Sequence, residues 1–211
     1  MHSNHRTIVL ASCLVKPINH FEQNRPVHLA RRDAYFERAV ELVSAQQNAY
    51  VPDIRIDLYE EILFLLRIAR EHGFFAIREA GKNEKDEQFG KFIRLLEGNA
   101  MAVLSMMELK GMVENPEGSF FSFLGANQAS VALQAEEYQR RANDIVRSML
   151  NTLRLAEEPF ATLKEEYMAA CREEDLARYK KAREHFTGQI RTGRHRPDAA
   201  IQERHGGVSP G

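Results

Sequence analysis

Apolar and polar residues follow the period of an α-helix along most of this chain. Apolar side chains recur at three- and four-residue steps in five stretches, which predict helices over about 31–47, 58–72, 84–113, 127–156 and 160–186. The second stretch is apolar around most of its circumference, which is typical of a helix that is buried or pairs with another chain. We expect the second, third and fourth of these helices to build the core.

Residues with strong backbone preferences predict where these helices begin and end. Asp57, followed three residues later by a glutamate, forms a capping box at the start of the second helix, and Gly73 suits the left-handed residue after its end. Pro159 is expected to stop the fourth helix. Gly90 and Gly98 weaken the third helix and are expected to permit a kink or a close approach between helices.

Two short segments before the helical core have strand character. Residues 7–15 are rich in β-branched side chains, and residues 51–57 alternate, with Ile54 and Ile56 on one face and Arg55 on the other. The sequence therefore predicts a mainly α fold, a helical bundle of five or six helices with one or two short N-terminal β-strands.

Charge is distributed unevenly, although the net charge of the 211 residues is only −1. Residues 1–38 carry six bases against three acids, and residues 178–211 carry eight against three, so the middle of the chain is acidic. Basic ends predict a polyanionic partner, although basic tails that bind nothing specific remain an alternative. We expect one mainly helical domain over 1–186 and a disordered basic tail over 187–211.

The strand and helix over residues 51–73, with another helix after them, resemble the ribbon-helix-helix DNA-binding regulators. The resemblance implies a dimer whose paired ribbons enter the major groove of double-stranded DNA. It also implies that Arg55 contacts bases or phosphates. The basic N-terminal region adds Arg25, Arg31 and Arg32, which we expect to contact the DNA backbone. The first hypothesis is therefore a dimeric, DNA-binding transcriptional regulator.

The chain departs from this family in two places. Pro52 is unfavourable in a DNA-facing ribbon, and the charged segment 82–87 separates two helices that a short turn usually joins. The layout of about the first 110 residues is also similar to the AcaB-like activators carried by conjugative elements, with no diagnostic motif. This second resemblance implies a regulator of transfer genes on a mobile genetic element.

A loop dense in phenylalanine supports a second hypothesis from another class. The segment 119–125 holds Phe120, Phe121 and Phe123, which either fold back on the core or form a partner or dimer contact. The acidic middle of the chain would repel DNA. The alternative is an all-helical protein-interaction adaptor or scaffold without enzymatic activity.

The sequence contains no catalytic signature, and we expect neither an enzyme nor a cofactor. Neither a phosphate-binding glycine loop nor a G-x-S-x-G motif occurs in it. Four histidines, His2, His5, His20 and His28, are close in sequence, but their spacing matches no known metal site. We therefore predict no metal and assign no catalytic residue.

The cysteines and the apolar runs bear on location. Cys13 and Cys171 are too far apart in sequence to suggest a disulfide framework, and no apolar run approaches the roughly 20 residues that span a bilayer. Leu-Ala-Ser before Cys13 is similar to a lipoprotein cleavage box, so a lipid-anchored periplasmic protein remains an alternative. The apolar stretch before it is shorter than the roughly seven residues a signal needs, so we expect a cytoplasmic protein.

Overall fold

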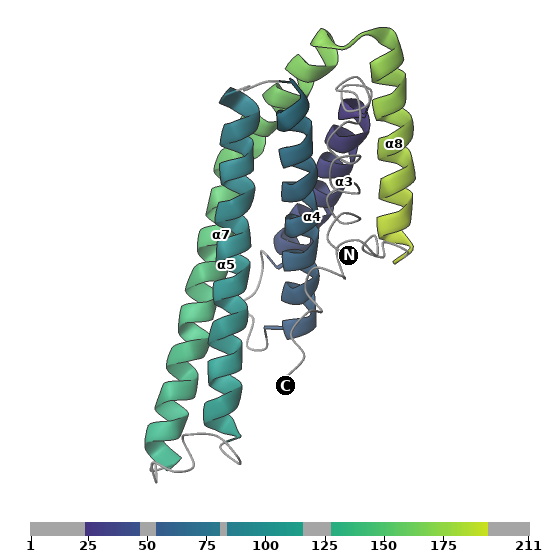
Figure 1. The fold of residues 1–211 in the computed structure, drawn as a ribbon. Coiled ribbons are helices and arrows are strands. Elements are labelled where there is room, and N and C mark those ends of the chain that lie inside the picture. The colour runs from purple at the N-terminus through teal and green to yellow at the C-terminus, as the bar shows by residue number, and fades with distance from the viewer. Residues whose placement is uncertain (1–23, 47–53, 81–83, 116–127, 194–211) are drawn as a thin grey trace, which may run out of the picture.

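The computed structural model describes residues 24–46, 54–80, 84–115 and 128–193, and these residues are mainly helical (Figure 1). The helices follow one another as α3 (Arg25–Ser44), α4 (Ile56–Ala80), α5 (Glu84–Glu114), α7 (Gln128–Ala170) and α8 (Glu173–Arg191). The predicted mainly α fold class is confirmed. None of the described helices is long and apolar enough to cross a membrane.

The predicted strands are not confirmed, because the described residues contain no strand. The segment 7–15 and residues 51–53 lie outside the described residues. Ile54 and Arg55 precede α4, and α4 itself begins at Ile56 with Asp57 in its first turn. The strand prediction is therefore wrong for residues 54–57. The physical reason is that the carboxylate of Asp57 stabilises the positive end of the dipole of α4. Ile54, just before this helix, is buried against the core.

Helix α3 begins six residues before its predicted start. Pro26 lies in its first turn, where the absence of an N–H removes no helical hydrogen bond. Pro26 therefore favours the earlier start of this helix.

The glycines also act differently from the prediction. Helix α4 continues through Gly73 to Ala80, so Gly73 is no C-cap, and a Cβ atom on it would lie 3.3 Å from Cδ of Arg32 in α3. Among the described residues, no atom would lie within 4 Å of a Cβ on Gly90 or Gly98. The close approach between helices therefore occurs at Gly73 and not at the two glycines for which it was expected.

The C-terminal helices are divided at a different place. Pro159 lies inside α7, which continues to Ala170, and the chain breaks at Cys171 and Arg172 before α8. Helix α8 ends at Arg191, so the first residues predicted to be disordered are helical.

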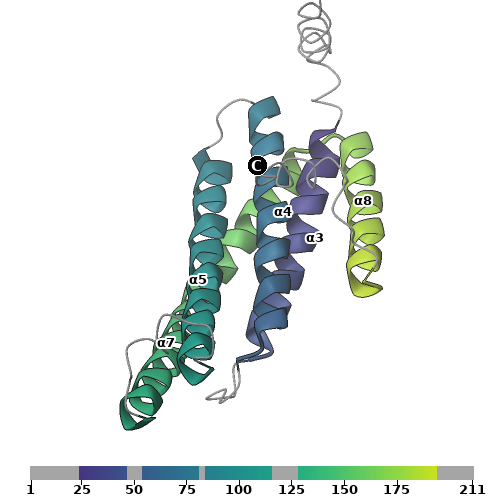
Figure 2. The same cartoon turned by 60° about the horizontal axis from the view of Figure 1, so that its bottom comes forward.

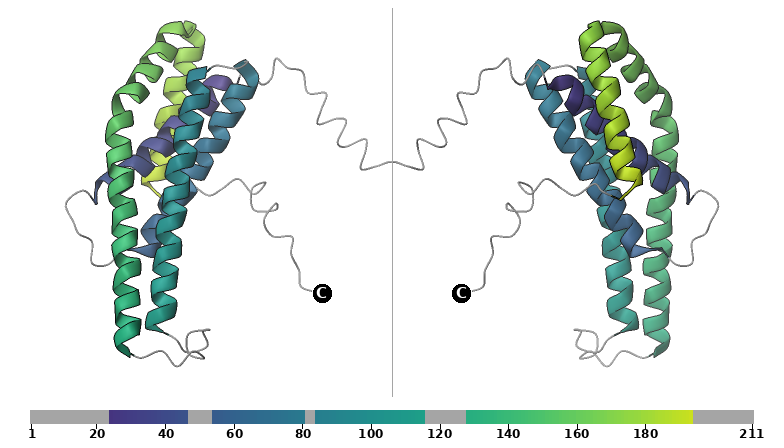
Figure 3. Two further views of the ribbon diagram at one scale, coloured as in Figure 1. Left: turned by 90° about the vertical axis from the view of Figure 1, so that its left-hand side faces the viewer. Right: turned by 90° about the vertical axis from the view of Figure 1, so that its right-hand side faces the viewer.

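The helices lie side by side in the order α7, α5, α4, α3 and α8 (Figures 1 and 2). Helix α7 packs along α5, and Figure 3 shows that it is curved and passes over to join α8. The largest fully buried apolar side chains include Leu65, Leu66, Ile93, Leu96 and Met149. Helix α3, which was not expected in the core, adds Phe36, Ala39 and Val43.

Candidate functional site

Four phenylalanine rings from three helices meet on one side of the bundle. Phe36 of α3 lies 4.9 Å from Phe89 of α5 and 5.1 Å from Phe160 of α7, measured between ring centroids. Phe89 and Phe160 stack at 4.8 Å, and Phe92 adjoins Phe89 at 6.3 Å. Such pairs contribute about 0.5–1.5 kcal/mol each beyond the area they bury. The cluster therefore holds α7 against α3 and α5.

Pro159 precedes Phe160 and changes the path of α7. It has no backbone N–H, so the carbonyl of Leu155 lacks the donor that a helix would supply four residues later. A proline ring also clashes with that carbonyl, which bends a helix at this point. The bend leaves a space between α7 and α5 that close packing would otherwise fill.

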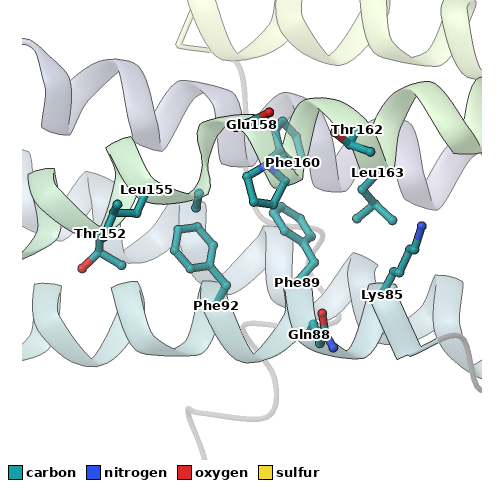
Figure 4. A pocket seen from close by; sticks show the side chains of 12 residues that line it. Lys85, Gln88, Phe89, Phe92, Thr152, Leu155, Glu158, Phe160, Thr162 and Leu163 are labelled. Carbon is teal, nitrogen blue, oxygen red and sulfur yellow. The ribbon is translucent and has the colours of Figure 1, made fainter.

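This space is an open pocket of about 680 Å³ between the start of α5 and the middle of α7 (Figure 4). Its apolar wall consists of Phe89, Phe92, Leu155, Phe160 and Leu163. Polar groups lie around that wall and come from Lys85, Gln88, Thr152, Glu158 and Thr162. An ion pair between Lys85 and Glu166 joins α5 to α7 beside the pocket. Leu155, on the same wall, is 76% exposed.

A second cavity of about 440 Å³ lies on the other side of the bend. It shares Phe92, Ala156 and Phe160 with the first pocket and adds Phe36 and Val40 from α3. The two spaces therefore flank the same aromatic side chains, and the bend of α7 is open on two sides.

Buried charges lie directly behind the aromatic cluster. Arg32 is 3% exposed and donates hydrogen bonds to Asp33 at 2.8 Å and to Asp86 at 3.0 Å. Arg25 also donates to Asp86, at 3.1 Å, and the hydroxyl of Tyr179 donates to Asp33 at 2.6 Å. This ion network, defined as Arg25, Arg32, Asp33, Asp86 and Tyr179, joins α3, α5 and α8. The hydrogen bonds between these opposite charges offset the free-energy cost of removing them from water.

The pKa shifts in the ion network follow from its geometry. Burial opposes the charge on Arg32, but Asp33 and Asp86 outweigh it and raise the pKa of this guanidinium. Burial and the neighbouring Asp33 raise the pKa of Tyr179, so its hydroxyl keeps its proton and donates. At neutral pH Arg32 is therefore charged and Tyr179 is neutral.

Two histidines face each other between α3 and α4. Nδ1 of His28 lies 3.0 Å from Nδ1 of His72, and Nη1 of Arg31 lies 3.5 Å from Nε2 of His72. Burial, with added repulsion from Arg31, lowers the pKa of both rings, and that of His72 falls to about 3. Both rings are therefore neutral at neutral pH.

The structure separates the residues that were predicted to contact DNA. Arg55 is exposed and forms an ion pair with Asp57, whereas Arg25 and Arg32 belong to the ion network. Arg31 is half-buried, with its guanidinium 4.3 Å from the ring centroid of Phe186. The structure therefore places three of the four arginines in packing contacts with other helices.

Other predicted site residues fall in parts of the chain that the structure does not describe. These are Phe120, Phe121 and Phe123 of the phenylalanine loop and the histidines before residue 24. His28 is described, and its ring partner is His72, which the sequence did not pair with it. Within the described ranges, no group of three His, Cys, Asp or Glu side chains is placed to hold a metal ion.

The pocket residues were missed because each looked like ordinary core. Phe89, Phe92 and Phe160 fit the helical period, and Pro159 was read only as a helix stop. The one available signal was a proline followed by an aromatic residue inside otherwise helical sequence, which indicates a bend with a bulky side chain beside it.

No protein-family model matches the chain, and neither the curated proteins nor the solved structures compared with it give a significant match.

Proposed function

We propose that the chain is an all-helical protein-interaction adaptor whose pocket beside Pro159 receives apolar side chains of a partner protein. The observation that carries the proposal is the open, aromatic-lined pocket of about 680 Å³. Binding pockets typically measure about 300–1,000 Å³ and combine an apolar wall with a few polar groups. No enzymatic step is part of this proposal.

The exposure of Leu155 supports the same function. A large apolar side chain that is 76% exposed beside an aromatic-lined pocket extends the apolar surface outwards. Large exposed apolar patches are rare on soluble monomers, and where they occur they usually mark interaction sites.

The charges near the pocket indicate which partner segment would bind. Between Arg154 and Glu166, α7 carries four glutamates against two bases. Lys85 of α5 pairs with Glu166, and the exposed acids beside the pocket include Glu157 and Glu158. Complementary charge steers association and rejects wrong partners. The fitting partner is therefore a short apolar segment flanked by lysine or arginine.

Selection of displayed peptides on the purified full chain tests this function. The Leu155→Glu chain serves for counter-selection, and Leu133→Glu is the matched control because Leu133 is also exposed on α7, at 67%, but lies far from the pocket. We expect apolar peptides with basic flanks that bind the wild type and Leu133→Glu and lose at least tenfold in affinity for Leu155→Glu. Peptides that bind all three chains equally would contradict the proposal.

A second candidate function, the dimeric DNA-binding transcriptional regulator, is supported by the surface of α8. Lys180, Lys181 and Arg191 are exposed on this helix, which leads into the basic residues 194–211. The DNA-contact role of Arg55 stays a prediction. If the two lysines contact phosphates, replacing both by alanine reduces the slope of log affinity against log salt by about 2. Absence of binding to duplex DNA at about 50 mM salt would reject this function.

A further inference from the structure

We propose that residues 8–15 of this same chain occupy the pocket beside Pro159, so that a partner segment binds by displacing them. The inference rests on the proposed function in one respect, since it uses the same pocket. It adds the identity of a resident occupant and a competition that controls access.

The first argument is where the chain enters the fold. Helix α3 begins at Arg25, whose guanidinium lies 3.1 Å from a carboxylate oxygen of Asp86 in α5. Asp86 is next to Lys85 and one helical turn from Phe89, and both of these residues line the pocket. The residues that precede α3 therefore join the bundle close to the mouth of the pocket.

The second argument is reach. Eight residues, 16–23, separate the apolar run from Asn24, and an extended chain covers about 3.3 Å per residue, or about 26 Å in all. Phe92 lies six residues beyond Asp86 on α5, which is about 9 Å along the helix axis. The run at 8–15 therefore reaches the far side of the pocket with several residues to spare.

The phenylalanine loop cannot reach this pocket within one chain. Helix α5 ends at Glu114, 22 residues beyond Phe92, so its end lies about 33 Å from the pocket along the axis. Helix α7 begins at Gln128, 27 residues before Leu155, or about 40 Å away. Reach therefore favours the run before α3 over the loop that sequence alone singled out.

The third argument is chemistry. The run reads I-V-L-A-S-C-L-V and contains no charged residue. Arg6 and Lys16 flank it, and Glu22 is the one acid among residues 1–23, which gives this segment a charge of 2 − 1 = +1. It is thus an apolar segment with basic flanks, which is the chemistry that the aromatic wall and the glutamates of α7 favour.

A spin label at residue 7 of the full chain tests the proposal. The chain carries Thr7→Cys, which keeps both basic flanks, with Cys13 replaced by alanine and Cys171 by serine, and a nitroxide is attached to the new cysteine. Methyl resonances of Leu155 and Leu163 report on the pocket, and those of Leu133 report on the distant part of α7. We expect the label to broaden the first two by at least threefold more than the third.

Substitutions at the pocket supply the controls. In the same labelled chain, Leu155→Glu is expected to abolish the broadening of Leu163, because it places a charge against the apolar run. Leu133→Glu is expected to leave that broadening unchanged. Broadening of Leu163 that persists equally in both variants would overturn the proposal.

Mixed samples separate docking within one chain from docking between copies. One copy carries the spin label and the other carries the isotope label. Broadening confined to doubly labelled chains supports the proposal, and broadening in the mixed sample overturns it in favour of exchange between copies.

The outcomes also distinguish this inference from the proposed function. If the label broadens neither leucine while selected peptides still require Leu155, the inference fails and the adaptor function stands. If the label broadens neither leucine and no peptide requires Leu155, both fail.

Discussion

The ring of Phe89 separates two regions that treat polarity in opposite ways. On one side the guanidinium of Arg32 lies 4.8 Å from the ring centroid, inside the ion network that joins α3, α5 and α8. On the other side the same ring lines an open pocket with other phenylalanines. Charge is thus enclosed while apolar surface is open, so residue class alone is a poor guide to which residues bind and which hold the fold.

The difference has a physical basis in what each region leaves unsatisfied. The ion network pairs every carboxylate it contains with a donor at 2.6–3.1 Å, so it has little to offer a ligand. The pocket contains apolar surface that water covers at a cost of about 25 cal/mol per Å². A ligand therefore gains more by covering the pocket than by competing for the buried arginines.

The largest expected effect comes from breaking the ion network. Asp86→Ala removes the acceptor of both Arg25 and Arg32 and leaves buried positive charge short of a partner. We expect the free energy of unfolding to fall by about 3 kcal/mol or more, as measured by urea denaturation. A loss below about 1 kcal/mol would mean that the ion network contributes little to the fold.

An exposed ion pair on the same helix is the control for this effect. Arg38 and Glu41 pair at 3.1 Å near the surface of α3. Arg38→Ala is expected to change the free energy of unfolding by less than about 1 kcal/mol, because solvent screens such a pair.

The ion network and the pocket also show how far sequence reasoning extends. Helix α5 was predicted over 84–113 and spans Glu84–Glu114, because its apolar period is strong and clear breaks flank it. Arg32 was assigned to DNA as part of the basic N-terminal region, and its partner Asp86 could not be recognised from the sequence because it lies 54 residues away. The pocket combines Phe89 with Phe160, 71 residues apart, so the local sequence could indicate the bend at Pro159 but not the pairing of these two rings. Periodicity predicts elements, whereas pairings across elements depend on the packing itself.

Proline illustrates the same limit. Pro159 was expected to end a helix, but it lies inside α7, which continues to Ala170. Packing of Phe160 between Phe36 and Phe89 holds the chain beyond it in place, so the helix bends and continues. Tertiary contacts outweigh the local preference there and create the pocket.

The histidine pair should make the stability of the fold sensitive to pH. The guanidinium of Arg31 can only donate, so Nε2 of His72 accepts and its Nδ1 carries the proton shared with His28. The pKa of His72 is about 3 in the folded chain, below the ordinary 6.5. Below pH 6.5 the unfolded chain binds a proton that the folded chain does not, so stability falls as pH falls.

The measurement is the free energy of unfolding between pH 6.5 and 5, above the range where most carboxylates titrate. His72 should account for a loss of about 1 to 2 kcal/mol over this interval. His72→Gln removes that titration while keeping hydrogen-bonding groups, so its curve should be flatter than the wild type. If the wild type and His72→Gln lost stability equally between pH 6.5 and 5, the titration of His72 would not be the cause of the loss.

Two glycines provide a smaller and oppositely signed test of the packing around Arg32. Gly98→Ala should stabilise the chain by about 1 kcal/mol, since alanine favours the helix and no described atom would lie within 4 Å of its Cβ. Gly73→Ala should lose that gain or destabilise, because its Cβ would lie 3.3 Å from Arg32, which two aspartates hold. Thermal unfolding of both variants measures the difference. Equal stabilisation would mean that Arg32 can move.

The smallest expected effect on stability is at the pocket, and it is the sharpest test of the comparison. Leu155 is exposed, so Leu155→Ser should change the free energy of unfolding by less than about 0.5 kcal/mol. The same Leu155→Ser change should weaken the binding of pocket-binding peptides. Asp86→Ala should have the opposite pair of effects, because it lowers the free energy of unfolding while the folded chain keeps its affinity for those peptides. Calorimetric titration of both variants at a temperature where each is folded separates the two roles. A Leu155→Ser chain that unfolds easily would place this leucine among the residues that hold the fold.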